Sequence, residues 1–417
     1  MHIIHCPYGY FPSISGAELY IQRLSEILLK RRHKLKVFCS NAIDFQAFRS
    51  PEGKFLSDSK VKINNVEIER FKIEYPKITK VFNLILNSSL TKIFNNLKFF
   101  NLYLLDLLKF IKNGPFIPDF FKGLLNEDSD IFHTTAIPYL NIVLALIAGK
   151  LKNIPVICTP FYHFENERYH EAAFTRILGE FNKILVCSKA EKDYLIENGV
   201  KEKKIEQIHM AIDLHKYERA KKKWFLDKFD ISGPKILFCG YKNAEKGAIN
   251  ILDCIKYVIS EVPDAKFIFI GPSTKSFNIK KRKLGDLREN IINIGVLPYD
   301  ATLKRGAFAA SDIYLMPSRS EAFGIAYLEA WACKKPVIGA DIKASIINDG
   351  QDGLVVPFNA SPKLLAEKIV KLIRDENLRY ELGLNGYNKI KKNNWTWEHL
   401  AVKIEGIYKE VINVSEN

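Results

Sequence analysis

Residues 2–40 read HIIHCPYGYFPSISGAELYIQRLSEILLKRRHKLKVFCS, and this stretch decides the fold class. A short apolar run is followed by a turn-rich loop, then by a segment with apolar residues at helical spacing, and then by a second apolar run. The pattern predicts a strand, a loop, an amphipathic helix and a strand, which together form a right-handed βαβ unit with a parallel sheet.

The same pattern returns along the 417 residues, so we predict an α/β fold with two doubly wound, Rossmann-like domains that face each other across a cleft. The first set of apolar runs continues through DIFHTT, IPVICTP and KILVCS, and a second set runs from PKILFCG to GLVVP. The charged stretch KKKWFLDKFDISG lacks a strand pattern, and we place a linker at about residues 213–233. The expected domains are residues 1–213 and 214–395. A last helix at 396–417 is expected to dock on either domain, including a return to the first.

Composition limits the kinds of binding partner and the cellular compartment that we expect. Lys and Arg number 62 against 47 Asp and Glu, and the net charge of +15 favours anionic partners such as phosphates, acidic lipid surfaces or nucleic acid. The seven cysteines are odd in number and form no C-x-x-C pair, which predicts reduced thiols and a cytoplasmic location. No apolar stretch reaches the ~18 residues that a membrane span needs, and the first residues do not resemble a secretion signal.

Residues 79–125 are rich in Phe, Leu, Ile, Asn and Lys, and they allow two interpretations. In the first, they form core-facing helices with solvated lysines. In the second, they form a basic aromatic surface that touches anionic lipid on the cytoplasmic face of a membrane or grips an apolar acceptor.

The most informative motif is PSRSEAFGIAYLEAWACKKPVIGAD, residues 317–341. A strand that ends near Met316 is followed by a loop and then by a helix expected to start at Phe323 or Gly324. Backbone N–H groups of the first helical turn would therefore point to the carboxyl edge of the sheet, where a diphosphate can bind. Further along the same helix, Glu329 has apolar neighbours, and ribose hydroxyls would satisfy its carboxylate.

Two glutamates eight positions apart, Glu321 and Glu329, flank the turn Phe323-Gly324-Ile325, and this motif resembles the signature of retaining glycosyltransferases of family 4, which have the GT-B fold. The resemblance implies that Glu321 and the turn amides hold the donor sugar and phosphate and that Glu329 holds ribose. It also implies transfer from a nucleotide-sugar to a hydroxyl acceptor with retained anomeric configuration, with no metal or other cofactor. The first domain would then be the acceptor side, and lipid-linked or surface glycans are candidate acceptors. The alternative is that Glu321 only caps the helix and Glu329 pairs with a lysine.

Three further residues are candidates for holding or activating the donor. Lys246 follows a strand that ends at Gly240, and its positive charge can stabilise a leaving diphosphate. The family usually has an arginine where Tyr241 stands here, so the next residue, Lys242, is a candidate second cation. Gly16 lets the backbone of the first domain approach a phosphate.

Candidate residues in the first domain lie after its expected strands. His133 is expected to face the crevice, and the resemblance implies a catalytic histidine after this strand. His163 and Glu165 are acceptor-side candidates, with a structural histidine and a solvated loop carboxylate as the alternatives.

The sequence lacks the motifs of several other enzyme classes. No H-E-x-x-H, clustered Cys/His or D-x-D pattern indicates a metal, no G-x-S-x-G indicates a hydrolase, and PYGYFPSISG is not a dinucleotide-binding G-x-G-x-x-G loop. Two alternatives remain open. One is a sugar-nucleotide epimerase on the same fold, and the other is a non-catalytic basic protein that binds RNA or membrane, although no RNA-binding motif is present and no nucleic-acid partner is expected.

Overall fold

A computed structural model describes residues 1–12, 15–75, 104–163, 165–298 and 301–416, and these divide into two compact units. Unit 1 comprises residues 1–209 and 400–417, and unit 2 comprises residues 210–399. Among the described residues, no helix combines the length and the apolar character that a bilayer crossing requires.

Unit 1 is built on an eight-stranded sheet with the order β3-β4-β2-β1-β5-β6-β7-β8, and every pairing except β3 with β4 is parallel. The strands are β1 (His2–Cys6), β2 (Lys34–Ser40), β3 (Lys60–Ile63), β4 (Val66–Phe71), β5 (Ile131–Thr135), β6 (Val156–Thr159), β7 (Lys183–Val186) and β8 (Ile205–Gln207). The central strands are buried on both faces, as expected for a parallel sheet covered by helices on both sides.

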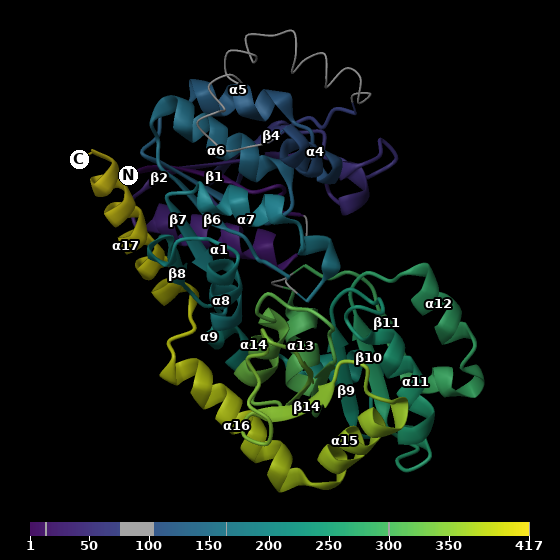
Figure 1. Cartoon of the computed structure of the whole chain (residues 1–417). Helices are drawn as coiled ribbons and strands as arrows, with labels where there is room; N and C mark the ends of the chain where they lie inside the picture. Colours follow the sequence, from purple (N-terminus) through teal and green to yellow (C-terminus); the bar gives the residue numbers. More distant parts are fainter. Residues whose placement is uncertain (13–14, 76–103, 164, 299–300, 417) are drawn as a thin grey trace. The chain divides into compact units, whose positions relative to one another are not determined.

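Helices cover both faces of this sheet (Figure 1). They are α1 (Gly16–Lys30), α4 (Leu104–Asn113), α5 (Pro118–Asn126), α6 (Leu140–Lys152), α7 (Ala172–Gly179), α8 (Lys189–Glu197) and most of α17 (Trp397–Glu416), with 3-10 turns η1 (Phe45–Phe48), η3 (Glu167–Tyr169) and η4 (Glu202–Lys204). The yellow helix α17 lies along unit 1, where Lys183 pairs with Glu410 and Lys403 pairs with Glu206.

Unit 2 has a six-stranded parallel sheet with the order β11-β10-β9-β12-β13-β14. The strands are β9 (Lys235–Cys239), β10 (Lys266–Ile270), β11 (Ile291–Ile294), β12 (Ile313–Met316), β13 (Val337–Asp341) and β14 (Gly353–Pro357). The helices are α9 (Leu214–Glu218), α10 (Lys222–Phe229), α11 (Ala248–Ile259), α12 (Lys275–Arg282), α13 (Thr302–Ala310), α14 (Ile325–Ala332), α15 (Pro362–Arg374) and α16 (Glu376–Lys392), with the 3-10 turn η5 (Gly285–Asn290). The two sheets have the doubly wound, Rossmann-like order that the sequence predicts.

The division of the chain differs in detail from the expected one. Unit 2 begins at Met210 rather than 214, because residues 210–212 are buried and the Ile212 N–H donates to the Trp395 carbonyl oxygen at 3.0 Å within the same unit. The expected linker at 213–233 contains the helices α9 and α10 instead. Phe225 of α10 is fully buried against α13, so this charged stretch is part of unit 2.

Residues 76–103 lie outside the described part of the chain, so the lysine-rich surface expected there is not described. The described remainder of the stretch 79–125 forms α4 and α5, where Phe110, Phe120 and Leu124 are fully buried. These three side chains belong to the core of unit 1.

Candidate active site

The order of the strands in unit 2 reverses between β9 and β12. The chain leaves β9 toward β10 and β11 on one side, and it leaves β12 toward β13 and β14 on the other. In open α/β sheets, ligands bind outside the carboxyl ends of the strands at such a switch point. The loops that follow β9 and β12 therefore form the candidate site.

Lys246 and Glu321 come from these two loops and form an ion pair. Lys246 Nζ lies 2.6 Å from Glu321 Oε1 and 3.3 Å from the carbonyl oxygen of Ser320. A hydrogen bond of 2.7 Å from the Arg319 N–H to the Glu245 carbonyl oxygen ties the two loops together. The structure thus brings together two residues, 75 positions apart, that the sequence predicts separately.

The turn after Glu321 is shaped by a glycine. Gly324 has φ of 86° and caps α14, which begins at Ile325, one residue beyond the expected start. A Cβ at this position would lie 2.5 Å from the ring of Tyr327, so both the conformation and the space favour glycine. The buried ring of Phe323 packs edge-on against Trp395 at 5.5 Å and anchors the turn.

The second glutamate of the motif already has protein partners. Glu329 is 2% exposed, and its Oε1 accepts hydrogen bonds from Lys304 Nζ at 2.7 Å and from the Tyr217 hydroxyl. The lysine partner matches the alternative considered from the sequence, but nothing in the sequence identified Lys304 of α13 or Tyr217 of α9, because neither belongs to the motif. Ribose binding by Glu329 stays a prediction.

Lys242 is directed into the protein rather than beside Lys246. The residue is fully buried, and its Nζ donates to Asn293 Oδ1 at 2.7 Å and to the Ile294 carbonyl oxygen at 2.8 Å. Burial, assisted by the charge of Lys281, lowers the pKa of Lys242 to about 8. In this structure, Lys242 holds the end of β11 and leaves the candidate phosphate site to Lys246.

Unit 1 has its own switch point between β1 and β5, and Gly16 begins α1 at the same edge. The sequence predicted that His133 of β5 faces an open crevice, but the structure places it inside unit 1. Its ring is fully buried, with Nδ1 hydrogen-bonded to the Tyr408 hydroxyl and Nε2 to Thr159 Oγ1 at 2.8 Å. Burial holds the pKa of His133 well below its ordinary value, so the imidazole is neutral. A catalytic role for His133 stays a prediction, and it would require this ring to leave its partners.

A second histidine completes this network. His5 lies opposite His133 in the parallel register of β1 and β5, and its Nε2 is 3.1 Å from the same Tyr408 hydroxyl. Its Nδ1 lies 2.7 Å from Ser25 Oγ of α1. The network joins the three strands β1, β5 and β6 to the helices α1 and α17, and sequence reasoning missed it because Tyr408 is 275 residues from His133.

The acceptor-side candidates follow β6. His163 is half-buried, with its ring 5.4 Å from that of Tyr169, and Glu165 is also half-buried. Both lie in unit 1, and neither is one of the two hydrogen-bond partners of His133, which are Tyr408 and Thr159.

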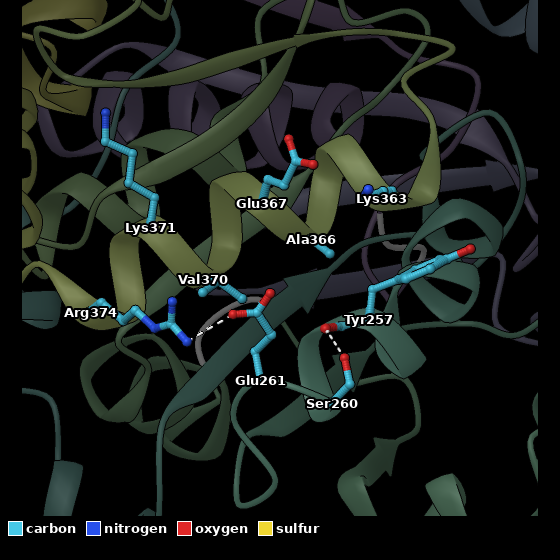
Figure 2. A pocket seen from close by; sticks show the side chains of 9 residues that line it. All are labelled: Tyr257, Ser260, Glu261, Lys363, Ala366, Glu367, Val370, Lys371 and Arg374. Atoms are coloured by element: carbon cyan, nitrogen blue, oxygen red, sulfur yellow. Dashed lines mark hydrogen bonds and ion pairs between the residues drawn. The ribbon is translucent and has the colours of Figure 1, made fainter.

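A groove of about 500 Å³ lies in unit 2 between α11 and α15, as Figure 2 shows. Glu261 and Arg374 form an ion pair of 2.8 Å across it. None of its lining residues belongs to the switch-point loops, so this groove is separate from the candidate site.

Two family models match the chain. Residues 14–216 match the model described as Glycosyltransferase Family 4, and residues 233–375 match the model described as Glycosyl transferases group 1. Together these two ranges cover most of the described residues of both units, including the loops that hold Lys246 and Glu321.

The chain is also similar to individual proteins and to solved structures. An uncharacterised glycosyltransferase of Methanocaldococcus jannaschii is 25% identical, with 99% of each chain covered. A phosphatidyl-myo-inositol mannosyltransferase of Mycobacterium leprae is 29% identical over 43% of this chain and 47% of its own. The crystal structure of Anabaena HepE in complex with UDP-glucose has a TM-score of 0.72 at 14% identity, with 98% of this chain and 100% of that chain covered. The chain therefore belongs to the family 4 glycosyltransferases, nucleotide-sugar-dependent enzymes with two Rossmann-like domains in the GT-B fold.

Proposed function

We propose that this protein is a retaining hexosyltransferase that needs no metal ion. The observation that carries the proposal is the Lys246–Glu321 pair at the switch point of unit 2. When the bond between the sugar and the diphosphate breaks, negative charge grows on the leaving phosphate. A lysine placed at the phosphate stabilises that charge directly, which is the role that a metal ion serves in other transferases.

The bond between sugar C1 and the phosphate oxygen breaks, and its electron pair stays on the phosphate. The acceptor oxygen bonds to C1 from the same face, and the acceptor proton passes to the leaving phosphate oxygen. Glu321, released from Lys246 by the arriving phosphate, accepts a hydrogen bond from a donor-sugar hydroxyl, and Glu329 accepts one from ribose.

The acceptor is proposed to be a lipid-linked or surface glycan. The name of the mycobacterial relative supports a lipid-linked acceptor, and the net charge of +15 supports peripheral contact with an anionic membrane. A cytoplasmic location is supported by the seven cysteines, all of them free thiols.

A donor screen tests this function. UDP-, GDP- and ADP-sugars are added singly, and we expect one of them to raise the melting temperature, because a ligand that binds the folded state stabilises it. Product made from that donor is then analysed by NMR, where the anomeric configuration of the donor should be kept, and EDTA should not reduce turnover.

Other outcomes would replace the proposal. An inverted product or loss of turnover in EDTA contradicts the retaining, metal-independent mechanism. A changed sugar-nucleotide in the absence of any acceptor identifies an epimerase. Strongly salt-dependent binding of RNA, with no response to any sugar-nucleotide, identifies a basic binding protein.

A further inference from the structure

Four aromatic side chains gather at the carboxyl ends of β1, β2 and β5 in unit 1. Tyr8 follows β1, Phe45 and Phe48 lie in η1 after β2, and Tyr139 follows β5. The Tyr8 and Tyr139 rings are 4.5 Å apart, and Phe48 packs edge-on against both, at 5.6 and 5.2 Å. We call these four residues the aromatic platform.

One ring of the platform is exposed while the other three support it. Phe45 is 51% exposed, whereas Tyr8, Phe48 and Tyr139 are buried. Phe45 lies nearly parallel to Tyr139, with an angle of 14° and 6.0 Å between ring centres, and 5.6 Å from Phe48. Scattered exposed apolar residues are ordinary, but a phenylalanine held open on three buried rings presents a rigid apolar face.

The position of the platform in the sheet points to a ligand. β1 and β5 are neighbours at the point where the strand order of unit 1 reverses, so the loops that carry Tyr8 and Tyr139 lie where open α/β sheets bind ligands. This switch point is the counterpart, in unit 1, of the one where Lys246 and Glu321 lie in unit 2.

Polar contacts hold two of the buried rings of the platform, Tyr8 and Tyr139. The Tyr8 hydroxyl hydrogen-bonds Ser15 Oγ at 2.8 Å, and Ser15 donates to the carboxylate of Glu18. The guanidinium of Arg168 lies 6.0 Å from the centre of the Tyr139 ring and donates to Asn113 Oδ1. Phe45 therefore offers an exposed apolar face, against which the C–H face of a ring with hydroxyls at its rim can pack.

We infer that the aromatic platform is an acceptor subsite that stacks a six-membered polyhydroxylated ring, a sugar or a cyclitol, on Phe45. The inference rests on the proposed function, since it assigns the acceptor side of that reaction. It adds Tyr8, Phe45, Phe48 and Tyr139 to the acceptor candidates that the sequence suggested.

The test is saturation-transfer NMR on the full chain with three separate probes: methyl α-D-mannopyranoside, methyl α-D-glucopyranoside and myo-inositol. We expect transfer to the ring C–H protons of at least one probe, and the responding probe distinguishes a sugar from a cyclitol. Phe45→Ala should weaken binding of that probe roughly five- to tenfold, the loss of one favourable ring contact. Phe45→Trp should restore it.

Tyr380→Ala is the matched control, because Tyr380 is a more exposed aromatic residue, on α16 of unit 2. It should leave probe binding unchanged. Melting temperatures of all variants check the fold, and Phe45→Gln serves if the alanine variant is unstable. Equal transfer in wild type and Phe45→Ala, or no transfer with any probe, overturns the subsite. The donor screen on the wild-type protein is read separately, so a failed subsite with intact donor binding leaves the proposed function standing.

Discussion

Lys246 Nζ lies 2.6 Å from Glu321 Oε1, although the two residues follow different strands of unit 2. The pair is partly shielded from water, with side-chain exposures of 24% and 11%. In the proposed mechanism, a donor diphosphate that reaches Lys246 would compete with a carboxylate already in place, and this competition would free Glu321 for the sugar.

Lys246→Met should reduce turnover by about 100-fold or more while it weakens donor binding far less, because the charge matters most as the phosphate leaves. Single-turnover rates and donor titrations separate the two effects. Lys256→Met is the control, since Lys256 is a lysine on α11 with its ammonium over Tyr257. A loss confined to donor affinity would contradict the assigned role.

Glu329→Ala is expected to cost stability as well as donor affinity. From the sequence alone, alanine is predicted to be tolerated here because it suits a helix. The structure adds that the variant removes the carboxylate that pairs with the Lys304 ammonium at 2.7 Å in a largely buried position, at a cost of about 3 kcal/mol. Urea unfolding measures this cost, and Lys304→Met combined with Glu329→Ala should recover most of it. Donor binding in that double variant then tests the ribose contact, and unchanged affinity would remove the assignment.

Tyr408→Phe should destabilise unit 1 by about 2–4 kcal/mol, because the Tyr408 hydroxyl hydrogen-bonds to a ring nitrogen of both His5 and His133. Hydrogen exchange in α17 reports the loss locally, and exchange in unit 2 serves as the internal reference. Tyr380→Phe, an exposed position, is the matched variant. Exchange in α17 that matches the wild type would show that the network does not secure this helix.

The two buried histidines predict a loss of stability in acid. Burial lowers the pKa of His5 to about 3 and that of His133 well below its ordinary value, whereas the unfolded chain titrates near 6.5. Below pH 6.5 the unfolded state therefore binds more protons, and the free energy of unfolding falls by up to about 1.4 kcal/mol per pH unit for each histidine. Chemical denaturation from pH 8 to pH 5 checks this decline. His5→Asn should make it shallower, and His215→Asn, at an exposed position, should not.

Lys242 predicts that stability continues to rise with pH in the basic range. Its pKa is about 8 in the folded protein and 10.5 when unperturbed, so the unfolded state holds the proton between these values while the folded state releases it. The contribution of Lys242 to the free energy of unfolding therefore rises from pH 8 to pH 10.5. The difference in stability between wild type and Lys242→Met should grow in favour of wild type across this window. A constant difference would mean that the amine keeps its proton inside the fold.

The sequence predicted the features that depend on local patterns of apolar residues. Apolar runs alternating with helical spacing indicated both sheets, and the loop around Glu321 could be placed because strand, loop and helix are consecutive. Partners from distant elements could not be predicted in this way: Lys304 reaches Glu329 from another helix, and Tyr408 reaches His133 across most of the chain. Such contacts depend on how helices pack on a sheet, which periodicity does not encode.

The position of Lys242 shows the same limit at a single residue. Its neighbour Tyr241 is 48% exposed, whereas Lys242 is fully buried. Adjacent positions in a loop have no fixed periodicity, so the sequence could not say which of them faces inward.

Residues 400–416 determine the order in which the two units can complete their folding during synthesis. Unit 2 is one uninterrupted segment. Unit 1 has two segments, and the second contains α17 from Leu400 onward, which follows unit 2 in the sequence. During translation, the first 209 residues are made before Tyr408. His5 and His133 therefore lack the hydroxyl that they share until the whole of unit 2 has been translated. The later-made unit can finish first, and the earlier-made unit is completed only when α17 arrives.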